Sequence, residues 1–181
     1  VKAGFIEDQR ILEIVEKDPA ACLDIASDAF REIVERSIRV KARVVSADLR
    51  EAGEREILNY GHTLAHAIER NERYQWRHGA AVAVGMMFAA ELSHLAGKLS
   101  EAEVDRHRDV LTSLGLPITY RSRQWPKLED SIKRDKKTRA GLLRFVVLDR
   151  IGRPSRLEGP DPALLLSAYA ALTQDCPWGR R

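Results

Sequence analysis

Residues 79–96 place the strongest constraint on the fold of this chain. They form a run rich in alanine, valine and methionine that is apolar on nearly every side of a helical wheel. A helix on a protein surface keeps one polar face, so a helix that is apolar all round has to be surrounded by other elements. The run contains Gly85 and Glu91 and is too short to cross a bilayer. It therefore predicts the buried central helix of a globular domain.

The segments on either side of this run also favour helices. Asp8 is placed to cap a helix that reaches about Val15. Residues 27–47 carry apolar side chains near the helical period, and residues 54–71 form the next predicted helix. Residues 100–103 (SEAE) have the spacing of a capping box, which predicts the start of another helix.

The last third of the chain adds a different element. Residues 142–148 (LLRFVVL) favour a β-strand, and residues 149–154 contain a glycine and a proline that can turn the chain into a short hairpin. Residues 161–173 then predict a closing helix. We see no repeat and no linker. The sequence thus predicts a mainly α fold, a single multi-helix domain over residues 1–181 with a small β-hairpin.

Charge and cysteine content narrow the class of protein. The 30 basic residues are nearly balanced by 27 acidic ones, for a net charge of +3. Proteins that bind nucleic acid or membrane surfaces usually have a dominant basic face, so we expect neither partner here. The two cysteines, Cys22 and Cys176, lie far apart, which is compatible with a reducing cytoplasm. The chain opens at Val1 without an initiator methionine, and we interpret it as a piece of a longer protein.

Four polar side chains share one side of the predicted helix over residues 54–71. At about 100° per residue, Arg55, Asn59, His62 and His66 project from a stripe roughly 60° wide. A guanidinium binds carboxylate or phosphate, and imidazoles bind metals. The stripe therefore predicts the wall of a cleft for an anion and a metal. An ion pair between Arg55 and Glu51 is the alternative explanation for the arginine.

The histidines are the candidate metal ligands. His62 lies within one predicted helix and His78 at the start of the next, so an antiparallel helix pair would bring both to one ion. Zinc in catalytic sites takes three protein ligands and keeps one position open. His66 could be a second ligand or a proton carrier. Spacing alone also allows core or surface histidines. The HTLAH segment lacks the glutamate of the HExxH protease motif, which argues against a metalloprotease.

Further charged residues could complete such a cleft. Lys41 interrupts an apolar-periodic segment, and residues 133–137 (KRDKK) form a charge run that more often indicates a solvated loop. Asp48 and Glu51 could act as acids or bases, or only favour a helix start. Gly61 is unfavourable inside a helix, which predicts that another group approaches its backbone closely.

Several short stretches resemble 3-dehydroquinate synthase in order and approximate spacing. They are residues 41–48 (KARVVSAD), 51–55 (EAGER), 58–69 (LNYGHTLAHAIE), 78–79 (HG) and 135–141 (DKKTRAG). The resemblance extends from residue 1 to about residue 152, and its most specific part surrounds the histidines. It is to the C-terminal, mainly helical half of that enzyme. The family converts 3-deoxy-D-arabino-heptulosonate 7-phosphate to 3-dehydroquinate and phosphate in the shikimate pathway, with NAD⁺ and zinc or cobalt.

The resemblance implies roles for individual residues. His62 and His78 match metal ligands, and Glu51 matches an acidic residue near the reacting centre. His66 and Arg55 match residues that take part in both binding and catalysis. The implied contacts to the phosphate, carboxylate and hydroxyls of the substrate come from Lys2, Lys41, Arg55, Asn59, His66 and one of Lys136 and Lys137.

The chain also departs from the family pattern. The family's third metal ligand is a glutamate in a Glu-Val-(Ile/Val)-Lys motif, and this chain opens at the last two positions, Val1 and Lys2. The N-terminal NAD-binding half is absent as well, and no GxGxxG loop occurs. We therefore expect the isolated chain to be inactive and its partners to be that N-terminal domain and a second copy in a homodimer.

Three other interpretations compete with this one. The chain could come from another sugar-phosphate cyclase, or from a metal-dependent polyol dehydrogenase of related fold. It could also be a helical domain that only packs or dimerises. The product formed, phosphate release, and the effect of replacing His62 and His78 would distinguish them.

Overall fold

The computed structural model describes residues 1–47, 54–137 and 143–173, and it confirms the mainly α class with one hairpin. The Glu54 side chain and those of residues 135–137 lie outside this description. The elements are α1 (Lys2–Ile6), α2 (Arg10–Lys17), the short 3-10 helix η1 (Ala21–Leu23), α3 (Asp28–Ala47), the 3-10 helix η3 (Glu54–Asn59), α4 (His62–Asn71), α5 (His78–Leu95), α6 (Glu101–Ser113), α7 (Trp125–Lys137), β1 (Arg144–Arg150), β2 (Arg153–Glu158) and α8 (Pro162–Ala170).

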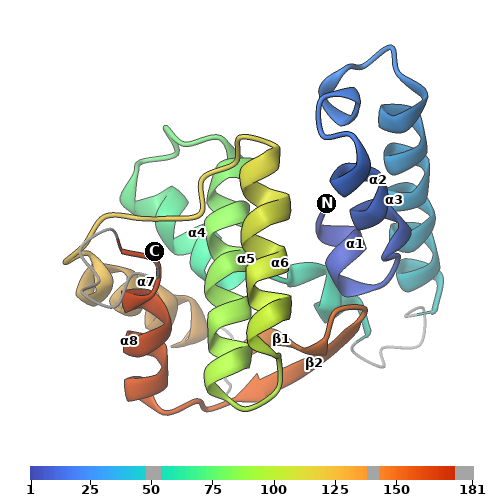
Figure 1. Ribbon diagram of the computed structural model, residues 1–181. Coiled ribbons are helices and arrows are strands. Elements are labelled where there is room, and N and C mark those ends of the chain that lie inside the picture. Colours follow the sequence, from blue (N-terminus) through green and yellow to red (C-terminus); the bar gives the residue numbers. More distant parts are fainter. Residues whose placement is uncertain (48–53, 138–142, 174–181) are drawn as a thin grey trace.

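Helix α5 is the centre of the fold, as its apolar sequence predicts. Every residue from Ala81 to Ser93 is buried. Helices α4, α6 and α8 and strand β1 all pack against it. In Figure 1, α1–α3 form a group at one side of this centre, and the hairpin runs beneath the helices. The group of α1–α3 reaches the rest of the molecule through contacts of α2 with α6 and of both α1 and α3 with η3.

Two of the predicted helix starts, at Ser27 and Ser100, are confirmed by their capping contacts. The Ser27 hydroxyl accepts the backbone N–H of Phe30 at 2.9 Å in the first turn of α3. At α6, Ser100 and Glu103 form the reciprocal capping box that their spacing predicts. Such caps satisfy backbone N–H groups that have no partner within the helix.

The prediction of one continuous helix over residues 54–71 is wrong. Gly61 has a left-handed backbone, with φ of +79°, and separates η3 from α4. The cause is a tight crossing with α5, because a Cβ on Gly85 would lie 2.0 Å from the Gly61 carbonyl oxygen. The close approach expected at Gly61 is therefore confirmed. The helical-wheel stripe is not, since Arg55 and Asn59 belong to η3 and the two histidines to α4.

Two helices are missing from the sequence prediction. Helix α1 has only five residues, too few for a periodic signal. Helix α7 buries Trp125, Leu128 and Ile132 at helical spacing and packs against α4. Its apolar positions are spread among polar residues, and the charge run 133–137, which we interpreted as a solvated loop, forms its last turn.

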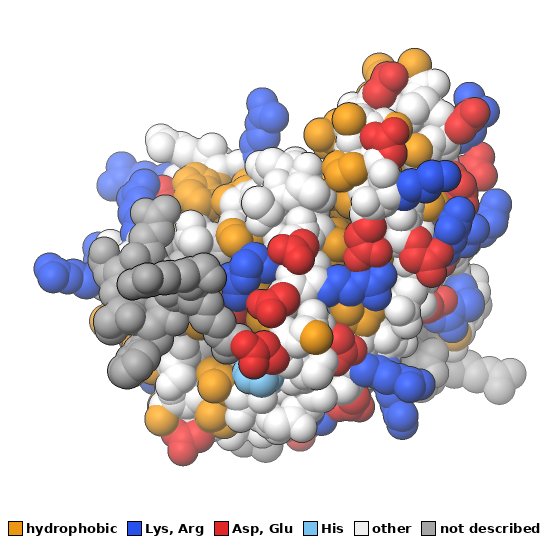
Figure 2. All heavy atoms as spheres, viewed as in Figure 1, with side chains coloured by type: hydrophobic (Ala, Val, Ile, Leu, Met, Phe, Trp, Pro, Cys, Tyr) orange, Lys and Arg blue, Asp and Glu red, His pale blue; other side chains and the backbone are white. Residues whose placement is uncertain are grey.

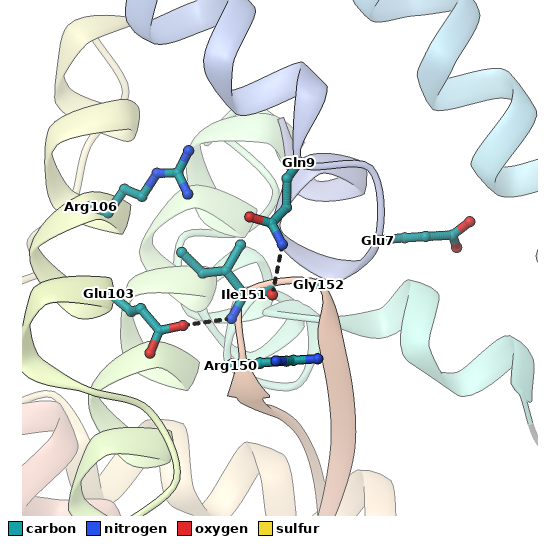
Figure 3. Close-up of a pocket in the computed structure, with 7 residues that line it drawn as sticks. All are labelled: Glu7, Gln9, Glu103, Arg106, Arg150, Ile151 and Gly152. Carbon is teal, nitrogen blue, oxygen red and sulfur yellow. Dashed lines mark hydrogen bonds between the residues drawn. The ribbon is translucent and has the colours of Figure 1, made fainter.

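Hydrogen bonds join the hairpin turn to the start of the chain and to α6. The Ile151 N–H donates to Glu103 Oε1 at 2.9 Å, and the Ile151 carbonyl accepts Gln9 Nε2 at 3.1 Å. The Gly152 N–H donates to the Phe5 carbonyl at 2.8 Å. These contacts surround a polar hollow whose lining also includes Glu7, Arg106 and Arg150 (Figure 3). Gln9 and Glu103 are thus the lining side chains that hold the turn.

The surface carries both signs of charge. On the face shown in Figure 2, the side chains of lysine and arginine are interspersed with those of aspartate and glutamate. Within the described residues, no helix has the length and apolar character needed to cross a membrane.

Candidate metal centre

The fold brings three of the histidines together. His62 is the first residue of α4 and His78 the first residue of α5, and these helices pack against each other. The ring centroids of His62 and His78 lie 5.4 Å apart. His66 follows one turn further along α4, with its ring centroid 5.5 Å from that of His62. The expected closeness of His62 and His78 is therefore observed, and their role as metal ligands stays a prediction.

His62 is held by the backbone just before α4. Its Nδ1 lies 3.1 Å from the carbonyl oxygen of Tyr60. A carbonyl only accepts, so Nδ1 carries the proton and Nε2 keeps its lone pair. Burial, and secondarily the nearby charge of Lys2, lowers the pKa of His62 to about 4. The ring is therefore neutral at neutral pH, which is the form that binds a metal.

His78 is held by a carboxylate. Its Nδ1 lies 2.8 Å from Oε1 of Glu69, a residue in the last turns of α4. A carboxylate that accepts this proton fixes the ring and makes the opposite nitrogen a better ligand. The His78 side chain is 59% exposed, whereas that of Glu69 is 13% exposed. The sequence interpretation assigned no role to Glu69, although its place seven residues after His62 on one helix face was a usable signal.

The two imidazoles fit a shared metal ion. Rings that bind one tetrahedral zinc through nitrogen have centroids about 5 Å apart, close to the 5.4 Å between His62 and His78. Both rings also have Nδ1 engaged, which leaves both Nε2 atoms to coordinate. Among the described residues, no group of three or more His, Cys, Asp or Glu is arranged to hold a metal.

Two predicted substrate-binding lysines lie beside this centre. The Lys2 ammonium donates to the Leu58 carbonyl oxygen in η3. Burial, and next the positive charge of Lys41, lowers the pKa of Lys2 to about 8. Lys41 itself is exposed on α3. The charge of Lys2 also contributes to the lowered pKa of His62.

The structure gives less detail on the remaining predicted site residues. Arg55 and Asn59 are both exposed on η3, directly before the turn that leads to His62. Glu51 and Asp48 lie outside the described residues, so the ion pair of Arg55 with Glu51 stays a prediction. Lys136 and Lys137 end α7, and their side chains lie outside the described set.

The fold matches one class of solved structures. A 2-epi-5-epi-valiolone synthase from Streptomyces hygroscopicus subsp. jinggangensis, with NAD⁺ and Zn²⁺ bound, aligns with a TM-score of 0.85 at 21% identity, over 94% of this chain and 48% of that one. A 2-deoxy-scyllo-inosose synthase aligns with a TM-score of 0.72 at 24% identity, over 93% and 47%. The chain therefore has the fold of about half of each of these two synthases.

The sequence comparisons give the particular family. The profile described as 3-dehydroquinate synthase C-terminal matches residues 1–138, and the chain belongs to this family. It is 64% identical over 169 residues to 3-dehydroquinate synthase from Streptomyces avermitilis, covering 93% of this chain and 47% of that protein. It is 61% identical over 175 residues to the same enzyme from Nocardia farcinica, covering 97% and 47%. The chain thus spans about half the length of these curated relatives.

Proposed function

We propose that this chain is the metal- and substrate-binding half of a 3-dehydroquinate synthase. The reaction is conversion of 3-deoxy-D-arabino-heptulosonate 7-phosphate to 3-dehydroquinate and phosphate. The observation that carries the proposal is the His62–His78 pair, whose rings are 5.4 Å apart with each Nδ1 fixed by an acceptor. Relatives of that name, among them one that is 64% identical to the chain, support the same assignment.

The residues around the pair would bind a substrate that has two anionic groups, a carboxylate and a phosphate. Lys2, Lys41 and Arg55 supply cationic groups for its carboxylate and hydroxyls. Asn59, His66 and one of Lys136 and Lys137 would hold its phosphate, and Glu51 would assist proton transfer near the reacting carbons. A bound divalent metal would polarise the substrate hydroxyl whose carbon is oxidised, and NAD⁺ would supply the hydride acceptor for that carbon. Most of the protein's own contribution is then orientation and charge stabilisation.

The same proposal specifies the partners. NAD⁺ would be bound mainly by an N-terminal half like that of the longer relatives, and a carboxylate from outside the described residues would be the third ligand of Zn²⁺ or Co²⁺. We also propose that the protein assembles as a homodimer in the cytoplasm and has no nucleic-acid or membrane partner. Family resemblance supports the dimer, which sedimentation would test. Balanced charge supports the absence of nucleic-acid and membrane partners.

A chimaera tests this function directly. Residues 1–181 would replace the matching half of the Streptomyces avermitilis enzyme, so that the NAD-binding half is supplied. We expect about one zinc or cobalt per chain, with phosphate release and 3-dehydroquinate formation. His62→Ala and His78→Ala should each remove the bound metal and lower the rate by roughly 10²-fold or more.

The matched control is His94→Ala. His94 lies in the last turn of α5, where Nδ1 bonds the Leu99 carbonyl at 2.9 Å, so the same substitution there should leave metal content and rate unchanged. A chimaera that folds and binds NAD⁺ but holds no metal would refute the proposal. If the chimaera instead cyclised a sugar phosphate without needing a carboxylate, the chain would belong to another cyclising synthase. Oxidation of a substrate without phosphate release would point to a dehydrogenase.

A further inference from the structure

The loop between α4 and α5 has an unfavourable backbone. Arg73 and Tyr74 are consecutive non-glycine residues with φ of 51° and 58°. Left-handed backbone of this kind crowds the Cβ atom, and it persists only where the surroundings fix it. The loop ends at His78, so its shape determines where this ring stands. Something outside the loop has to hold it in place.

Hydrogen bonds within and next to the loop hold part of this left-handed backbone in place. The Tyr74 N–H donates to the Glu69 carbonyl oxygen at 2.7 Å, and the Gln75 N–H donates to the Glu72 carbonyl oxygen at 3.0 Å. Glu69 therefore contacts both ends of the turn, since its carboxylate accepts the proton of His78 Nδ1. These bonds close the turn locally but do not anchor it to the rest of the domain.

Tyr120 supplies that anchor. It lies on the segment that leads from α6 back toward α7 (Figure 1) and is only 4% exposed. Its hydroxyl donates to Glu72 Oε1 at 2.5 Å and accepts from Asn71 Nδ2 at 2.8 Å. Its ring packs edge-on against Trp76, with centroids 5.5 Å apart. The one side chain thus contacts both the start and the end of the loop.

Tyr120 is itself well fixed. Its backbone N–H donates to the Leu172 carbonyl at 3.1 Å, just after α8. Burial, and next the hydrogen bond to Glu72, raises the pKa of Tyr120 to about 12. The hydroxyl therefore keeps its proton and remains a donor at neutral pH. It belongs to neither the predicted ligands nor the predicted substrate contacts.

We propose that Tyr120 is a positioning residue of the metal centre, whose hydroxyl holds the loop 72–77 so that His78 faces His62. The inference rests on the proposed function, because His78 must be a ligand for its position to matter. Loss of the hydroxyl removes the partner of Asn71 and leaves Glu72 with its 3.4 Å ion pair to Arg121. The turn can then relax, so that His78 spends less time in the binding geometry. The apparent metal affinity then falls in proportion to the fraction of molecules in which His78 is in the binding geometry.

The test uses the chimaera loaded with Co²⁺. In Tyr120→Phe, the ring and its packing on Trp76 remain and only the hydroxyl is lost. We expect cobalt to bind about tenfold more weakly, with an altered visible spectrum. In the metal-free protein, the amides of residues 72–77 should exchange faster with solvent. Tyr169→Phe is the matched control, since it removes a buried hydroxyl that donates to the Arg121 carbonyl at 2.5 Å but does not contact the loop.

Each outcome of this experiment either supports or overturns the role proposed for Tyr120. Weaker cobalt binding and faster loop exchange in Tyr120→Phe alone would support the proposal. Unchanged affinity and exchange would overturn it, while the proposed function would stand if the wild-type chimaera bound cobalt and turned over. Equal losses in both variants would show a general effect of deleting a buried hydroxyl and would also overturn it. If Tyr120→Phe failed to fold, Glu72→Ala would test the same tether, and normal cobalt affinity there would count against it.

Discussion

His62 and His78 are supported in opposite ways. His62 follows a glycine crossing buried against α5, and its Nδ1 bonds the backbone of fully buried Tyr60. His78 stands 59% exposed at the end of a loop with left-handed backbone, held by the Glu69 carboxylate. The core fixes one candidate ligand and polar contacts fix the other. Changes near His62 should therefore lower the free energy of unfolding, whereas changes near His78 should mainly alter metal affinity.

The largest effect should come from Gly85→Ala. The added Cβ would lie 2.0 Å from the Gly61 carbonyl oxygen, so the two helices have to separate. We expect the free energy of unfolding to fall on the order of 4 kcal/mol, measured by urea denaturation. Gly79→Ala is the control on the same helix, because nothing lies within 4 Å of its Cβ position. It should change stability by less than about 1 kcal/mol. Similar losses in both variants would contradict the tight crossing.

The second largest effect should come from lowering the pH, which should reduce the free energy of unfolding through a buried histidine. His107 stacks on Phe5 with ring centroids 3.8 Å apart, and its Nε2 lies 3.0 Å from the Tyr60 hydroxyl. Burial lowers the pKa of His107 to about 4 from an ordinary 6.5. Between these values the unfolded chain binds a proton that the folded chain does not. Stability is therefore full above pH 6.5 and falls toward pH 4, by at most roughly 3 kcal/mol.

The pH dependence can be assigned by substitution. The pKa of half-buried His62 is also lowered, so without metal it acts in the same direction. His107→Phe keeps a ring against Phe5 and removes the titrating group. Urea midpoints measured from pH 7 to 4 should then fall less steeply than in the wild type. An unchanged slope would mean that another group carries the acid sensitivity.

The smallest effect on stability should come from Glu69→Gln. The amide oxygen can still accept the proton of His78 Nδ1, but the negative charge that strengthens the opposite nitrogen is lost. We expect about a tenfold loss of cobalt affinity in the chimaera, or about 1.4 kcal/mol, with an unfolding free energy close to wild type. A large loss of stability without loss of affinity would reverse the contrast between the two sides.

Most of the fold follows from local signals. The all-round apolar run at α5 and the capping box at Ser100 predict elements that the structure contains. The sequence pointed to a close approach at Gly61 but not to a break in the helix, because the break depends on Gly85, which is far along the chain but adjacent in space. Helix α7 was missed since its buried positions, such as Leu128, are spaced among charges.

The candidate site was predicted in part. The sequence pointed to His62 and His78, which the structure brings together. It did not point to Glu69 or Tyr120, because a supporting residue is recognised by what it contacts and not by its type. The roles of Glu51, Lys136 and Lys137 stay predictions from the resemblance.

The hairpin turn has a consequence for the order in which the chain becomes structured. Helix α1 has five residues, too few to be stable alone. One of its anchors is the bond from the Gly152 N–H to the Phe5 carbonyl, and Gln9 just after it reaches Ile151 across 142 positions. Contacts this distant form slowly. The helix that carries Lys2 should thus be ordered late, and pulse-labelled amides of α1 should gain protection no earlier than those of β1 and β2.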